Sequence, residues 1–130
     1  MKNQSNARRM LAMALKDFKA LHVMMDPEKV DDEIFGFHVQ QAVEKSIKAW
    51  LVHLNVDFPK THDVRALVGI LAQTGADVEG IWSLVEFNNF GVQFRYESYD
   101  DQGGLDRSDA VQRVKTLLDK VAMIMGEMKQ

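Results

Sequence analysis

Four polar side chains recur at helical spacing within the stretch 31–55, namely Gln41, Glu44, Lys45 and Lys48. Residues three and four apart share one face of a helix, so the four form a polar stripe. One interpretation is a solvated face that carries a Glu44–Lys48 ion pair, and another is a cleft in which the lysines bind a phosphate. Apolar residues cover the other sides of this helix, so the stripe can also be partly buried, and a partly buried pair would order the bundle.

His62 and Asp63 stand where the next helix is expected to begin. The structural interpretation is capping, because the side chain of Thr61 or Asp63 can accept hydrogen bonds from free backbone N–H groups of a first turn. The functional interpretation places His62 near Arg95 as part of a nucleotide pocket. Both interpretations stay open.

Arg95 lies between two aromatic residues, Phe94 and Tyr96. An arginine beside aromatic rings can grip a phosphate while a base stacks nearby. A structural arginine that binds loop carbonyls or a carboxylate explains the same pattern equally well. The candidate residues for binding a phosphate or nucleotide are therefore Arg95, Tyr96, Lys45, Lys48 and His62.

Several other chemistries find no support in the sequence. The chain has no cysteine, which excludes disulfides and thiolate metal sites. The acidic residues of the stretch 100–109 do not have the spacing of a calcium loop. No two of the four histidines are four residues apart, the spacing that places two metal ligands on one helical turn. We therefore predict no metal, no cofactor and no assigned catalytic residue.

Length and charge bound the class of protein. The chain of 130 residues predicts a single domain over residues 1–130. Lys and Arg total 16 against 19 Asp and Glu, a net charge of -3, whereas dedicated nucleic-acid binders usually carry a basic surplus. No signal-peptide pattern and no apolar run long enough to cross a membrane occurs. We expect a cytoplasmic protein without a membrane partner.

The apolar periodicity predicts an all-α fold, an up-and-down antiparallel bundle of about five helices. Apolar side chains on more than one side of the second helix favour a central position for it. The alternation of apolar and polar residues in 92–96 also suits a short extended segment, and that choice stays open. The helices are expected over about 7–25, 31–55, 61 or 63 to 75, 76–78 to 88–91, and 106 or 108 to 128.

A longer pattern extends over the second helix and the connector that follows it. Residues 40–49 read QQAVEKSIKA, residues 59–64 read PKTHDV, and Arg95-Tyr96 follows the fourth expected helix. This pattern resembles the HEPN domain family, which has Q-x-A-x-E-K-x-x-K-A on its second helix, T-H-D before the third and an R-Y pair after the fourth. The resemblance covers nearly the whole chain, including the order and lengths of the helices.

The resemblance implies a helical bundle, a homodimer and one of two activities. Many HEPN proteins are metal-independent ribonucleases, often toxins, whose active site is an R-x(4–6)-H motif. Others lack that motif and bind nucleotides, RNA or a partner nucleotidyltransferase. In this sequence no arginine precedes a histidine at the required spacing. A histidine is well suited to move the protons of metal-free RNA cleavage, whereas an arginine alone cannot relay a proton.

Three hypotheses follow. The first is a non-catalytic HEPN protein of a toxin–antitoxin-like module, which binds a nucleotide or RNA phosphate, a partner nucleotidyltransferase, or both. The second is a ribonuclease with an atypical site built from Arg95, Tyr96 and His62. The third is an oligomerising helical scaffold without a small ligand, which would show an exposed apolar surface and no basic concavity.

Overall fold

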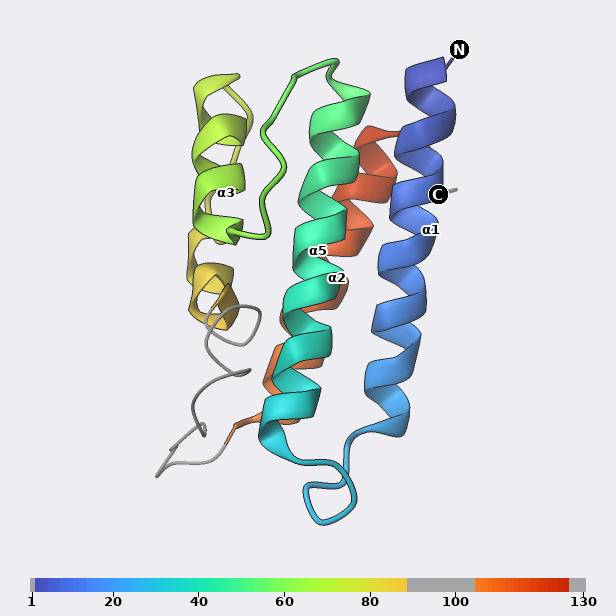
Figure 1. Cartoon of the computed structure of the whole chain (residues 1–130), viewed down its shortest axis with the longest axis vertical. Helices are drawn as coiled ribbons and strands as arrows, with labels where there is room; N and C mark the ends of the chain where they lie inside the picture. The colour runs from blue at the N-terminus through green and yellow to red at the C-terminus, as the bar shows by residue number, and fades with distance from the viewer. Residues whose placement is uncertain (1, 89–104, 127–130) are drawn as a thin grey trace.

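The computed structural model describes residues 2–88 and 105–126 of the chain, and within these ranges all regular structure is helical (Figure 1). The expected all-α bundle of five helices is therefore confirmed. The elements are α1 (Lys2–Val23), α2 (Asp32–His53), α3 (Val64–Gln73), the short 3-10 helix η1 (Trp82–Phe87) and α5 (Arg107–Ile124).

The helix α2 is the central element, as its apolar pattern predicted. It contacts α1, α3, η1 and α5. Its line of small side chains, Ala42, Ser46 and Ala49, is fully buried, which is how small residues let neighbouring helices approach. The hydroxyl of Ser46 donates to the carbonyl of Ala42 at 2.6 Å, so burying this polar group leaves no donor unpaired.

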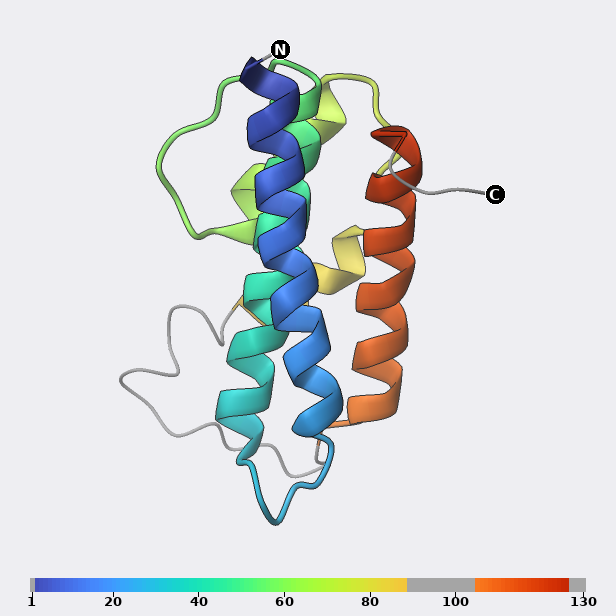
Figure 2. The same ribbon diagram turned by 90° about the vertical axis from the view of Figure 1, so that its right-hand side faces the viewer.

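The directions of the helices follow from the connector between α2 and α3. The helices α1 and α2 form an antiparallel pair joined by a short loop (Figure 1). Residues 54–63, here called the connector, run back along the bundle, so that α3 points in the same direction as α2. Figure 2 shows α5 running alongside α1 and α2, also in the direction of α2.

The end of α3 and the fourth helix differ in how well the sequence predicted them. Gly75 adopts a φ of 89° just after α3, a left-handed conformation that favours glycine and ends helices. The fourth helix was expected to begin at 76–78, but η1 begins only at Trp82. The reason is local: Asp77 accepts from the backbone N–H of Glu79 at 3.0 Å, and Gly80 adopts a φ of 82°, so this stretch forms turns.

The start of α5 is fixed by a buried arginine. Arg107 is 5% exposed, and its guanidinium donates to the carbonyl oxygens of Met24 and Val30 and to Oδ1 of Asp32, the last at 2.8 Å. It also lies 4.8 Å from the ring centroid of Phe35. One side chain therefore ties the loop between α1 and α2 to the first turn of α5.

Among the described helices, none is both long and apolar enough to cross a membrane.

Candidate functional site

Glu44 is the centre of a polar network in the middle of α2. Its side chain is only 4% exposed. Oε1 accepts from Nε2 of Gln40 at 3.0 Å, and Oε2 accepts from Nζ of Lys48 at 2.9 Å. Nδ1 of His62 lies 3.0 Å from Oε2 and 3.2 Å from Oε1. Three donors thus surround one buried carboxylate, and two of them come from α2 itself at four-residue steps.

The network keeps Glu44 ionised. Burial by itself would raise the pKa of Glu44, but the hydrogen bonds from Lys48, His62 and Gln40 outweigh burial and lower the pKa below its ordinary value. An ionised carboxylate only accepts hydrogen bonds. The Nδ1 atom of His62 must therefore carry the proton in this contact, and in the neutral imidazole Nε2 is left as an acceptor.

Gln40 joins the connector to α2. Its Nε2 donates a second hydrogen bond, to the backbone carbonyl of His62, at 3.0 Å. Its Oε1 accepts from Nε2 of Gln41 at 2.7 Å. Gln40 is fully buried, and because its amide is satisfied on both sides it can lie there at little cost.

The first turn of α3 is held by side chains from both directions. Asp63 caps the helix, with Oδ1 accepting from the backbone N–H of Arg65 at 3.0 Å. Thr61 accepts from the backbone N–H of Asp63 at 3.0 Å. Asn88 donates to Asp63 at 2.9 Å and accepts from the backbone N–H of Val64 at 2.8 Å. The capping interpretation of Asp63 is thereby confirmed.

The second lysine of the stripe is paired on the opposite side of α2. Nζ of Lys45 lies 2.7 Å from Oδ2 of Asp17 on α1, and Nδ1 of His38 lies 3.3 Å from Oδ1 of the same carboxylate. Nζ of Lys48 in turn lies 6.0 Å from the ring centroid of Phe58 in the connector. Each lysine therefore has a carboxylate partner within the bundle.

Comparison with known families decides the identity of this framework. The family model of the HEPN domain matches residues 7–129, which is nearly the whole chain. The chain belongs to the HEPN domain family. No curated protein and no solved structure matches it.

The structure brings part of the predicted site of this HEPN domain together. Lys48 and His62 share Glu44, whereas Lys45 points to Asp17. Lys48 is largely buried, while the side chain of His62 is 75% exposed. Arg95 and Tyr96 lie outside the described residues. Within residues 2–88 and 105–126, no group of three or more histidine and carboxylate side chains is arranged to hold a metal ion.

Sequence reasoning missed several members of these networks. Gln40 belongs to the HEPN string, but was not assigned a role, and its position among apolar neighbours was a usable signal for burial. Asp17 is the only acidic residue of α1, which was also a signal, because a lone carboxylate in a basic helix favours a specific partner. His38 and Asn88 carried no signal, since their partners are far away in the sequence.

Proposed function

We propose that this HEPN domain is non-catalytic and acts by binding a nucleotide or an RNA phosphate. The observation that carries the proposal is the absence of an R-x(4–6)-H motif from a chain that otherwise has the HEPN framework. Without that motif, the arginine and histidine of the usual nuclease site do not share one helix.

The contacts narrow the phosphate-binding residues. A phosphate that took Lys45 or Lys48 would have to displace Asp17 or the buried Glu44, and leaving such a carboxylate unpaired is costly. His62 is different, because only Nδ1 faces Glu44 and most of the side chain is exposed. The proposed ligand group is therefore His62 together with Arg95 and Tyr96, and Lys45 and Lys48 are proposed to stabilise the bundle.

A thermal-shift panel of nucleotides and short RNAs tests this proposal. A ligand that binds only the folded state raises its stability with the logarithm of its saturation. We expect a rise in Tm for the wild type that is lost in Arg95→Ala and in His62→Ala. The control is His22→Ala, because His22 is exposed on α1 and its Nδ1 lies only near the Phe18 carbonyl of its own helix. If no nucleotide or RNA shifts Tm, the proposal fails and the scaffold hypothesis gains.

The proposal extends to protein partners on the strength of the family alone. A homodimer and a separate nucleotidyltransferase, as in a toxin–antitoxin-like module, are the partners that the resemblance implies. Sedimentation of the purified chain tests the dimer, which requires twice the mass of one chain. Sedimentation at the mass of one chain over the whole accessible concentration range would remove the dimer from the proposal.

A second function is favoured by the contact between Glu44 and His62. The buried carboxylate fixes Nδ1–H, and Nε2 makes no hydrogen bond to the residues that the structure describes. A histidine oriented in this way can accept the proton of an RNA 2′-hydroxyl. With Arg95 to stabilise phosphate charge, this would be an atypical ribonuclease. RNA cleavage that depends on His62 but not on His22 would establish this second function in place of the first.

A further inference from the structure

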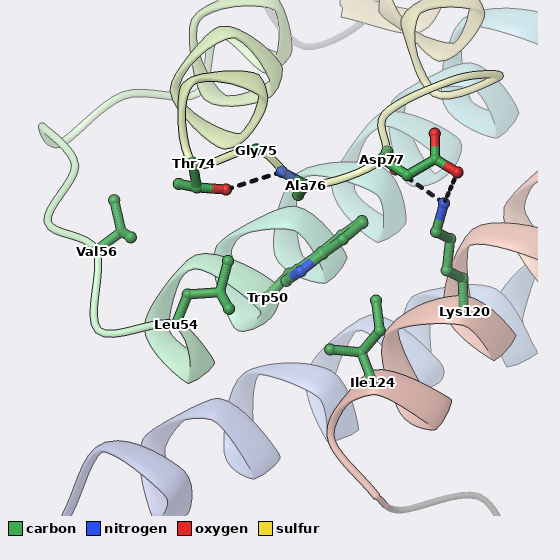
Figure 3. A pocket seen from close by; sticks show the side chains of 9 residues that line it. All are labelled: Trp50, Leu54, Val56, Thr74, Gly75, Ala76, Asp77, Lys120 and Ile124. Carbon is green, nitrogen blue, oxygen red and sulfur yellow. Dashed lines mark hydrogen bonds and ion pairs between the residues drawn. The ribbon is translucent and has the colours of Figure 1, made fainter.

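A pocket of about 520 Å³ opens at the end of the bundle where α2, α3 and α5 finish (Figure 3). That volume falls in the range of small-molecule sites. Its walls include the indole of Trp50, together with Leu54 and Ile124, and its rim includes Asp77 and Lys120. Leu54 and Ile124 are each 38% exposed although both are large and apolar. The pocket thus combines an apolar interior with one ion pair at its edge.

The backbone makes this end of the bundle electronegative. Leu54 and Thr74 are the C-caps of α2 and α3, and Ile124 is the last residue of α5. A helix C-terminus carries a partial negative charge that a cation stabilises. The last turns of α3 and α5 contain no basic residue. The last turn of α2 contains only His53, which is hydrogen-bonded to Gln4 at 2.8 Å.

The charged residues of the rim do not reverse this balance. The ammonium group of Lys120 donates to the carbonyl of Asp77 at 2.8 Å and lies 3.6 Å from Oδ2 of Asp77. It also lies 5.6 Å from the ring of Trp50. The side chain of Asp77 is 72% exposed, so a ligand can reach its carboxylate. The hydrogen bond from the backbone N–H of Glu79 and the charge of Lys120 lower the pKa of Asp77 and keep it ionised.

Trp50 adds an unused donor. The residue is 2% exposed, yet its Nε1–H makes no hydrogen bond to any residue of the described ranges. A buried indole N–H usually has a partner. Figure 3 shows the indole between Leu54 on one side and Lys120 and Ile124 on the other, along the pocket. A ligand with a neutral oxygen acceptor would satisfy this donor.

We propose that the pocket binds a small amphiphilic amine. Its apolar body would lie against Trp50, Leu54 and Ile124, its ammonium group would face Asp77 and the helix ends, and a hydroxyl or carbonyl oxygen would accept from the indole. This site goes beyond the phosphate-binding function and does not depend on it, since it uses neither Glu44 nor His62.

A fluorescence titration tests the amine site with two probes that differ only in charge. The sequence has two tryptophans, so Trp82→Phe leaves Trp50 as the only reporter. The probe 2-amino-1-phenylethanol has the proposed aromatic body, hydroxyl and ammonium, and mandelate carries a carboxylate instead of the aminomethyl group. We expect saturable binding of the amine and binding of mandelate that is weaker by about tenfold or more.

Variants in the Trp82→Phe background locate the binding. Asp77→Asn should weaken the amine about tenfold, and Ile124→Phe should abolish binding by filling the pocket. Met123→Phe is the matched control, because Met123 is also exposed but does not line the pocket. The inference is overturned if the amine shows no saturable binding, if mandelate binds as tightly, or if Asp77→Asn binds the amine like its parent. Since Asp77 is on the surface, that last comparison holds even if Ile124→Phe does not fold.

Discussion

Nδ1 of His62 lies 3.0 Å from Oε2 of Glu44, and this contact joins the end of the connector to the middle of α2. Lys48 and Gln40 bind the same carboxylate, and Gln40 also holds the backbone carbonyl of His62. Glu44 is thus the common acceptor of the network. The path of the connector, and with it the start of α3, depends on this one side chain.

Replacing Glu44 by alanine should therefore destabilise the fold. Removing one partner of a buried ion pair leaves the other charge uncompensated, and Lys48 is largely buried. We expect Glu44→Ala to lower the free energy of unfolding by about 3 kcal/mol. Urea denaturation followed by circular dichroism measures the change.

A matched control for this variant lies on α5. Lys115 and Asp119 form an exposed pair at 2.7 Å with the same four-residue spacing. Because exposed pairs contribute little, Asp119→Ala should cost about 0.5 kcal/mol or less. Equal losses in Glu44→Ala and Asp119→Ala would show that the network around Glu44 does not hold the fold together.

The lowered pKa of Glu44 predicts a dependence of stability on acid pH. Hydrogen bonds from Lys48, His62 and Gln40 lower the pKa in the folded state in spite of burial. The unfolded chain then binds more protons, so the contribution is complete above the ordinary glutamate pKa of about 4.3 and is lost as the pH falls through the lower folded value. Between about pH 5 and about pH 3, stability should fall more steeply in the wild type than in Glu44→Gln. Parallel profiles in urea titrations would contradict the assignment.

Arg107 should be irreplaceable by another cation. Its planar guanidinium holds the carbonyls of Met24 and Val30 and the carboxylate of Asp32 at once, and a lysine ammonium cannot copy that fork. We expect both Arg107→Ala and Arg107→Lys to lower the free energy of unfolding, the alanine variant by about 3 kcal/mol or more. Arg65→Ala, on an exposed position of α3, should change stability by less than about 0.5 kcal/mol. Wild-type stability of Arg107→Lys in chemical denaturation would refute this account.

Asp63 and Asn88 should act as one unit at the start of α3. Asp63 caps the helix, and Asn88 binds both Asp63 and the backbone N–H of Val64. Asp63→Ala should cost about 1 kcal/mol, the usual contribution of an N-cap. Because the two side chains share a hydrogen bond, the double variant with Asn88→Ala should cost less than the sum of the single variants, by about 0.5 kcal/mol or more. Strict additivity in this cycle would mean that the two contacts are independent.

The sequence predicted the helices well because their signal is local. The apolar spacing marked α1, α2, α3 and α5, and Gly75 marked the end of α3. The fourth helix was misplaced because apolar spacing does not report the turn that Asp77 and Gly80 form.

The candidate site was only partly predictable for the same reason. The stripe on α2 was visible, and the four-residue step correctly paired Glu44 with Lys48. The partners that decide its role come from distant segments: His62 from the connector and Asp17 from α1. The position of Arg107 beneath the loop between α1 and α2 had no local pattern at all, because its partners are backbone carbonyls that any sequence supplies.

An RNA cleavage assay tests most directly whether this HEPN domain is non-catalytic. Purified wild type, His62→Ala and His22→Ala would be incubated with labelled total RNA in the presence of a metal chelator, and the products would be resolved over time. The account predicts that RNA incubated with the wild type stays as intact as RNA without protein. Cleavage by the wild type and by His22→Ala that disappears in His62→Ala would contradict it, and would identify a ribonuclease that works through the Glu44–His62 pair.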